Sequence, residues 1–181
     1  MKLRIYTDTH LYSPIYDGTK ITNVSDSYFI GDNVDLVNVR KKDYQNALKT
    51  NQYFMDNAKG YIPGNHEAIS LVNQIIKIGN VMLVHGDAEA WSKKRAINYR
   101  SKKHCAGWLK RNIWVRALKN FEKIGKHKPS KKMIDNLVSH ARLRDCTTII
   151  AGHKHPRETY DKLHDGVRVI VLKRGLTEIE V

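Results

Sequence analysis

Short apolar runs of strand length separate longer polar stretches along this chain, and each run ends just before polar residues. Two later segments, residues 157–163 and 167–172, flank His164-Asp165-Gly166, so they predict a β-hairpin. The five earlier runs predict strands at residues 3–7, 27–30, 60–63, 81–84 and 147–151.

Four segments between these runs predict helices, because their apolar residues recur every three or four positions. Gly79-Asn80 ends the second helix, and Pro129-Ser130 separates the third from the fourth. Strands that alternate with helices predict an α/β sandwich rather than a bundle or a barrel. The expected helices cover residues 41–56, 68–78, 109–123 and 134–141.

The positive charge of the chain is concentrated in one segment. The 181 residues hold 32 Lys and Arg against 18 Asp and Glu, a formal charge of +14. Residues 91–132 contain 15 of the basic residues and a single acid, Glu122, whereas the rest of the chain is neutral. This balance predicts an anionic partner. A chain with 41% hydrophobic and 28% charged residues is neither a disordered polyelectrolyte nor a membrane bundle.

The two cysteines, Cys105 and Cys146, are too few for a disulfide framework, which favours a reduced setting. The N-terminus has no apolar signal region, and no apolar run approaches the roughly 20 residues that span a bilayer. These features predict a cytoplasmic protein without a transmembrane segment. The length predicts one domain over residues 1–181.

Polar residues cluster directly after the five predicted strands. Ligand sites in open α/β sheets lie at the carboxyl ends of strands, so these loops are expected to converge. Each block alone also fits an ordinary turn, and it is their common order that indicates a metal site. Carboxylate, imidazole and amide ligands without thiolate are typical of Mn, Fe, Zn or Ni sites. The blocks are Asp8-Thr9-His10, Gly31-Asp32-Asn33-Val34-Asp35, Gly64-Asn65-His66-Glu67, His85-Gly86-Asp87 and Gly152-His153-Lys154-His155.

In this order the blocks resemble the D-x-H, G-D-x-x-D, G-N-H-(E/D), H and G-H-x-H pattern of the calcineurin-like metallophosphoesterase superfamily, over about residues 3–172. The resemblance implies a four-layer αββα sandwich with a basic helical insert at about residues 88–144. It also implies two divalent metal ions, with manganese expected and Fe, Zn, Ni or Mg as alternatives. The implied ligands of one ion are Asp8, His10, Asp32 and His155, and those of the other are Asp32, Asn65, His85 and His153.

The resemblance further implies an enzyme that cleaves a phosphate ester with a metal-activated hydroxide. The expected substrate is a nucleotide or another phosphomonoester or phosphodiester. His66 is the implied catalytic histidine beside the scissile phosphate, and either Asp35 or Glu67 orients it. Protein phosphatases of this superfamily carry an Arg where this chain has Leu36, so a cation that clamps phosphate has to come from elsewhere.

Two alternative functions remain open from the sequence. A helical insert after His-Gly-Asp is loosely similar to bacterial UDP-2,3-diacylglucosamine pyrophosphohydrolases, and Tyr99 and Arg100 would then contact a UDP-sugar lipid at the membrane surface. The second alternative is a non-catalytic binding module on the same fold, which the retromer subunit of this superfamily resembles. The basic segment itself fits a solvated helical face, a rim that attracts nucleotides or nucleic acid, or peripheral contact with an anionic membrane.

Overall fold

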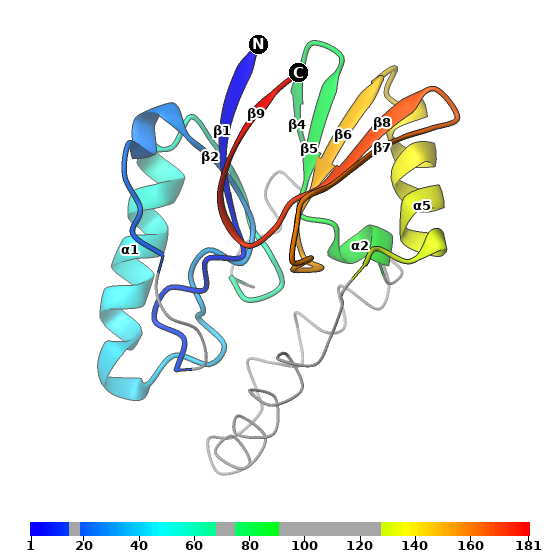
Figure 1. Cartoon of the computed structure of the whole chain (residues 1–181). Coiled ribbons are helices and arrows are strands. Elements are labelled where there is room, and N and C mark those ends of the chain that lie inside the picture. The colour runs from blue at the N-terminus through cyan, green and yellow to red at the C-terminus, as the bar shows by residue number, and fades with distance from the viewer. Residues whose placement is uncertain (15–18, 68–74, 91–127) are drawn as a thin grey trace.

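Two β-sheets packed face to face form the centre of the computed structural model, which describes residues 1–14, 19–67, 75–90 and 128–181 (Figure 1). The first sheet has the strand order β3-β2-β1-β9. In this sheet β1, β2 and β3 are parallel, whereas β9 runs antiparallel to β1. Its strands are β1 (Lys2–Thr7), β2 (Tyr28–Ile30), β3 (Gly60–Ile62) and β9 (Gly175–Glu180).

The second sheet has the order β4-β5-β6-β8-β7. Its three central strands are parallel, and the two edge strands β4 and β7 run antiparallel to their neighbours. The carboxyl ends of β5 and β6 therefore lie at one edge. The strands are β4 (Ile75–Ile78), β5 (Val81–Val84), β6 (Thr148–Ala151), β7 (Tyr160–His164) and β8 (Val167–Val171).

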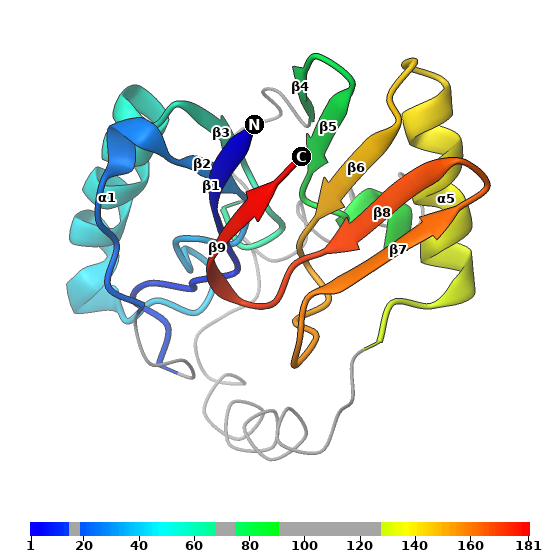
Figure 2. The ribbon, with the colours of Figure 1, turned by 45° about the horizontal axis from the view of Figure 1, so that its top comes forward.

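Helices cover the outer faces of both sheets (Figure 2). Helix α1 (Tyr44–Asn57) covers the four-stranded sheet, and α5 (Lys131–Arg142) covers the five-stranded sheet. A short helix, α2 (Asp87–Ala90), is tied to α5 by the 2.6 Å contact between Glu89 Oε1 and His140 Nδ1. The layers run helix, sheet, sheet, helix, which confirms the αββα sandwich. Two single-turn 3-10 helices, η1 (Val24–Asp26) and η2 (Lys41–Asp43), lie before β2 and α1.

The alternation of side chains along each strand builds three apolar layers. In β5, Val81 and Leu83 face the core between the two sheets, whereas Met82 and Val84 face α5. In β1, Ile5 joins the core between the sheets and Tyr6 joins the core beneath α1. Both faces of these strands are buried, which explains why the sequence shows continuous apolar runs.

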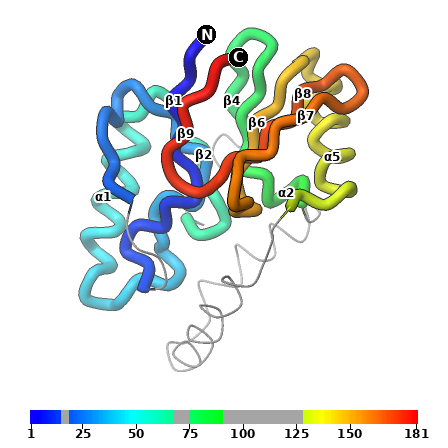
Figure 3. Tube along the Cα trace, viewed as in Figure 1, coloured from blue at the N-terminus to red at the C-terminus, as the bar shows by residue number. Residues whose placement is uncertain are grey.

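The two chain ends meet at one edge of the sandwich because β1 pairs with β9 (Figure 3). The amino group of Met1 donates a hydrogen bond of 2.7 Å to the carbonyl oxygen of Val181. The sequence predicts a β-rich tail but does not single out β9 as a strand. Its partner, β1, is far away in the chain, so no local pattern indicates the pairing.

The predicted helices at residues 41–56 and 134–141 are confirmed. In α1, Phe54 is buried, and Tyr44 and Leu48 pack against the same core. Helix α5 begins after Ser130, whose hydroxyl accepts a hydrogen bond of 3.3 Å from the backbone amide of Met133.

The helix predicted over residues 68–78 is wrong for its last four residues, since Ile75–Ile78 is strand β4. Gly79-Asn80 does not end a helix but forms the two-residue turn of a hairpin, with Gly79 at φ 58°. Residues 75–78 form a strand rather than a helix because they pair with Val81–Val84 across this turn. Their β-branched side chains pack well in a sheet. Residues 68–74 lie outside the described residues.

The predicted basic helices also lie largely outside the described residues, which resume at residue 128. Within the expected insert of residues 88–144, the described part includes α5, which packs on the five-stranded sheet. Among the helices that the structure describes, none combines the length and apolar character needed to cross a membrane.

A matched pair of leucines tests the layer assignment. Leu83 is fully buried between the sheets, whereas Leu163 on β7 is 72% exposed. We expect Leu83→Ala to lower the free energy of unfolding by about 2–5 kcal/mol and Leu163→Ala to change it by less than about 0.5 kcal/mol. Urea denaturation followed by circular dichroism measures both. Equal losses in the two variants would contradict the assignment.

Candidate metal centre

The five polar loops predicted to converge do meet at one end of the sandwich. In the first sheet, the amide of Asp8 donates to the carbonyl of Gly31 at 2.9 Å, and the amide of His10 donates to that of Asp32 at 2.9 Å. In the second sheet, the amide of Gly152 donates to the carbonyl of His85 at 3.0 Å. Because parallel strands end at the same edge, loops far apart in the chain become neighbours.

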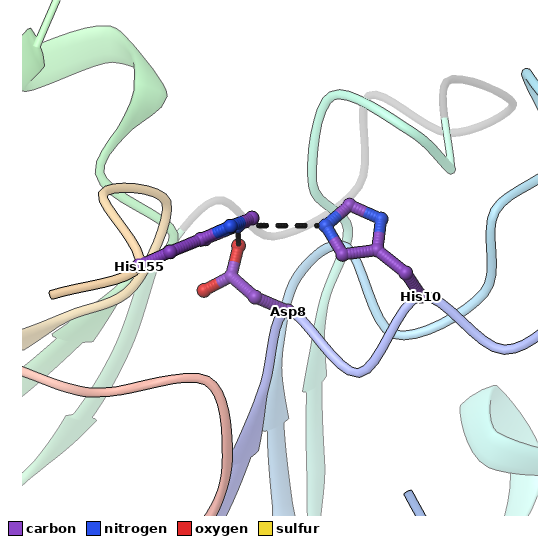
Figure 4. Close-up of side chains that lie close together, drawn as sticks. All are labelled: Asp8, His10 and His155. Atoms are coloured by element: carbon purple, nitrogen blue, oxygen red, sulfur yellow. Dashed lines mark hydrogen bonds and ion pairs between the residues drawn. The ribbon is translucent and has the colours of Figure 1, made fainter. Parts of the chain in front are cut away.

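One group of potential ligands consists of Asp8, His10 and His155 (Figure 4). The Nε2 atom of His155 lies 3.0 Å from Asp8 Oδ1 and 3.4 Å from His10 Nε2. The other oxygen of Asp8 accepts hydrogen bonds from the Thr7 hydroxyl at 2.7 Å and from the amide of His153 at 2.9 Å. These bonds fix the carboxylate, so that one oxygen points between the two imidazoles.

A second group consists of Asp32, His85 and His153. The Nδ1 atom of His85 donates to the carbonyl oxygen of Ile30 at 2.9 Å, which leaves Nε2 as the potential ligand atom. That Nε2 lies 3.5 Å from Asp32 Oδ2 and 3.3 Å from Asn65 Oδ1. The amide oxygen of Asn65 therefore faces the same point as the carboxylate and the imidazole.

Asp32 connects the two halves of the centre. It belongs to the group with His85 and His153 and also to a group with His10 and His66. His10 in turn belongs to the group of Asp8. The ligand atoms within each group lie within 4.8 Å of one another. The three groups thus form one continuous cluster, with the carboxylate of Asp32 in its middle.

The protonation states of two imidazoles, those of His10 and His153, suit metal ligands, which must be deprotonated. Burial, together with the neighbouring His66, lowers the pKa of His10 to about 3. Burial and the neighbouring His85 lower the pKa of His153 to about 4. Both side chains are therefore neutral near pH 7.

The carboxylates of the cluster are ionised. Burial disfavours their charge, but His155 holds the pKa of Asp8, and His85 that of Asp32, below the ordinary carboxyl value. Burial likewise disfavours the imidazolium of His85, but Asp32 and Asp8 outweigh it and raise its pKa to about 10. At neutral pH His85 is therefore protonated, and a metal ion would displace the proton from its Nε2 atom. The buried carboxylates of Asp8 and Asp32 favour such a cation.

Backbone strain is concentrated in the same residues. A positive φ is uncommon outside glycine and persists where surrounding structure enforces it, often at functional sites. The sheet ends and loop hydrogen bonds enforce it here. Five of the seven predicted ligands have a positive φ: Asp8 at 53°, His10 at 48°, Asp32 at 53°, His153 at 72° and His155 at 44°.

Two glycines allow the loops to approach closely. A Cβ atom on Gly64 would overlap the side chain and the backbone nitrogen of Asp32. A Cβ atom on Gly152 would overlap the hydroxyl of Thr7 and come within 2.8 Å of the Asp8 carboxylate. The glycines of the sequence blocks therefore make room for the carboxylates of the centre.

The structure distinguishes between the two residues expected to orient His66. Asp35 Oδ1 lies 2.9 Å from His66 Nδ1. Asn38 holds Asp35 in turn, with its backbone amide donating to Oδ1 at 2.8 Å and its side-chain amide donating to Oδ2 at 3.0 Å. The Nε2 atom of His66 lies 4.0 Å from Asp32 Oδ2. Asp35 is thus the residue that contacts His66, on the side of the ring away from Asp32.

Glu67 has a different role. Its buried carboxylate accepts hydrogen bonds from the amides of Asp32 at 2.7 Å, Val34 at 2.9 Å and Gly64 at 2.6 Å, and from that of Asn33. Burial beside Asp32 raises the pKa of Glu67 to about 7, although the amides of Gly64 and Val34 favour the ionised form. Glu67 therefore shapes the loop that presents Asp32.

All seven predicted ligands, together with His66 and Asp35, lie in this one cluster. The predicted substrate contacts Tyr99 and Arg100 lie outside the described residues. Three supporting contacts were not predicted from the sequence: the Thr7 hydroxyl on Asp8, Asn38 on Asp35, and the carboxylate of Glu67 on the backbone. Asn38 has a local signal, because the side chain of an Asp in a turn often bonds to the backbone a few residues later.

No family model and no curated protein matches this sequence. Among solved structures, a dimetal phosphatase from Danio rerio is similar at 13% identity and a TM-score of 0.49, over 98% of this chain and 91% of that one. A predicted phosphoesterase from Streptococcus pneumoniae is similar at 12% and 0.45, over 96% and 74%. Vps29 from Entamoeba histolytica in complex with zinc is similar at 16% and 0.43, over 96% and 74%. The side chains of the centre, rather than these distant likenesses, carry the functional assignment.

Proposed function

We propose that this chain is a dinuclear metal-dependent phosphohydrolase of the calcineurin-like type. The observation that carries the proposal is the position of Asp32, whose carboxylate is shared between a group with His10 and His66 and a group with His85 and His153. A carboxylate between two such groups is suited to bridging two cations. The αββα sandwich and the five ordered loops support the same function.

The donor set fits two divalent ions. Carboxylate, imidazole and amide oxygen are suited to Mn²⁺, and also to Fe, Zn, Ni or Mg. When bound, a metal pair polarises phosphoryl oxygens and lowers the pKa of water, so that hydroxide is available near neutral pH. In the proposed assignment, Asp32 is the ligand common to both ions. The other ligands of one ion are Asp8, His10 and His155, and those of the other ion are Asn65, His85 and His153.

His66 is the proposed catalytic residue outside the ligand set. Its Nδ1 contacts the carboxylate of Asp35, and its ring is T-shaped against His10 with the centroids 4.6 Å apart. Asp35 orients the ring. The opposite atom, Nε2, faces Asp32 and donates a proton to the leaving oxygen of a phosphate ester.

The proposed substrate is a phosphate ester, with nucleotides as the first class to test. We further infer that residues 1–181 form one catalytic domain, with residues 88–144 as an elaboration between β5 and β6. One apolar core shared by both sheets supports this inference. The five loops of the metal centre leave the strands that this core holds in place.

Removal of the shared carboxylate tests the bridging role. We expect Asp32→Ala to bind less metal than the parent protein and to lose activity to background, because neither ion keeps its full ligand set. Metal content after reconstitution with Mn²⁺ and desalting is measured by mass spectrometry. The exposed Asp26 provides the control, and Asp26→Ala should match the parent protein in both metal content and activity. Two full metal equivalents in a folded Asp32→Ala protein would overturn the bridge.

The role of His66 predicts a different signature. We expect His66→Gln to lower kcat by about 10²–10⁴-fold with metal content unchanged, since general acid catalysis is lost and no ligand is removed. The same substitution at His164, which bonds to Tyr160 far along the sheet, should leave kcat unchanged. Loss of metal from His66→Gln would assign His66 to the ligand set instead.

A substrate panel decides between an enzyme and a binding module. The panel contains p-nitrophenyl phosphate, bis-p-nitrophenyl phosphate, 5′-nucleotides, single-stranded DNA and UDP-sugars, each with Mn²⁺ and without metal. We expect metal-dependent hydrolysis of at least one compound. Protein that carries metal and hydrolyses none of them would instead be a binding module, and hydrolysis of UDP-sugars alone would identify a pyrophosphohydrolase.

A further inference from the structure

A groove of about 410 Å³ lies beside the loop that carries His153 and His155. One wall is formed by Pro156, Arg157 and the residues up to Tyr160, and the other by Lys128 and Pro129 ahead of α5. Figures 1 and 2 show this loop and the start of α5 at the same end of the sandwich as the ends of β1 and β6. Cavities that bind small molecules start at about 300 Å³, so the groove is large enough for part of a substrate.

The groove has an excess of positive charge. Lys128, Arg157 and Lys162 line it, and Glu158 is the one acid among the described residues of its lining. Among the described residues, none of these three cations forms an ion pair with a carboxylate. Arg168, by contrast, pairs with Asp161 at 2.7 Å. The cations of the groove therefore remain available to a ligand.

A cation–π contact between Lys162 and Tyr160 lies on one wall of the groove. The Nζ atom of Lys162 lies over the ring of Tyr160, 5.8 Å from its centroid. This contact holds the ammonium group against one wall of the groove. Arg157 is exposed, and its planar guanidinium is suited to bidentate bonding with a phosphate.

The groove is also close to the metal centre. Arg157 follows His155 by two residues, so their Cα atoms are no more than about 7.6 Å apart. A phosphate ester held by the centre can therefore reach the groove with the rest of its molecule. Leu36 stands where protein phosphatases of the superfamily that this sequence resembles carry an arginine, so a cation that binds phosphate has to come from another segment. Arg157 in the groove is one such cation.

We propose that the groove binds a second phosphate group of the substrate. The inference rests on the proposed function and narrows its substrate class to small phosphate esters that carry two separate phosphates. One phosphate lies at the metal centre, and the other is bound by Arg157, Lys162 and Lys128. Charge-assisted hydrogen bonds to the second phosphate strengthen substrate binding and leave the chemistry at the first phosphate unchanged.

The test uses two nucleotides that differ by one phosphate, adenosine 3′,5′-bisphosphate and adenosine 5′-monophosphate. With the metal-loaded protein, we expect a KM for the bisphosphate that is at least about tenfold lower, as one charge-assisted hydrogen bond provides. The double variant Arg157→Glu/Lys162→Glu should lose this preference, with kcat and KM for the monophosphate changed by less than about twofold.

Lys41→Glu/Lys42→Glu is the matched control, because it makes the same change in charge at two exposed lysines of η2. We expect this variant to keep the preference for the bisphosphate. An equal loss of preference in both double variants would show that overall charge, not the groove, attracts the second phosphate, and would overturn the proposal. Equal KM values for the two nucleotides in the parent protein would also overturn it, while hydrolysis itself would uphold the proposed function.

A binding measurement separates the groove from catalysis. Titration of metal-free protein with inorganic pyrophosphate, followed by calorimetry, should show binding that Arg157→Glu/Lys162→Glu weakens at least about tenfold and that Lys41→Glu/Lys42→Glu preserves. If neither adenosine nucleotide is hydrolysed, the substrate panel decides the proposed function, and this titration alone decides whether the groove is an anion site. Pyrophosphate binding that is absent, or equal in the parent and both variants, overturns the groove.

Discussion

The carboxylate of Asp32 is the feature on which the rest of the centre depends. One oxygen accepts a hydrogen bond of 2.6 Å from the amide of His66, and the other lies 3.5 Å from His85 Nε2. Its own backbone amide donates to Glu67. A charge buried at this depth needs compensation by hydrogen bonds and opposite charge. The loops after β2, β3 and β5 supply that compensation together, so the negative charge orders three chain segments and creates a place for a cation.

This arrangement is strained, and the sandwich stabilises it. Left-handed backbone at a residue other than glycine costs of order 1–3 kcal/mol, and it occurs at five of the predicted ligands. The apolar core between the two sheets, which includes the fully buried Leu83 and Ile150, holds the strands from which these loops leave. The stability gained in the apolar layers therefore offsets the backbone strain at the metal centre. The strained backbone fixes the direction of each ligand side chain.

The metal centre and the neighbouring groove carry charge of opposite sign. The centre is acidic and favours metal ions, whereas the groove beside it is basic and favours anions. In the proposed function, the reacting phosphate of the substrate would be neutralised by the bound cations, and its second phosphate by Arg157 and Lys162. Lys128 belongs to the basic segment of residues 91–132, so part of the charge asymmetry seen in the sequence lies beside the proposed active site.

The sequence by itself determined the helices α1 and α5, most strands, and the set of residues that meet at the centre. These follow from local periodicity and from short blocks at strand ends. Only the tertiary structure decided that Ile75–Ile78 is a strand, that β9 pairs with β1, and that Asp35 rather than Glu67 contacts His66. The physical reason is the same in each case. Strand pairing and the contacts of a carboxylate depend on a partner residue. That partner lies elsewhere in the chain, so the local sequence pattern does not show it.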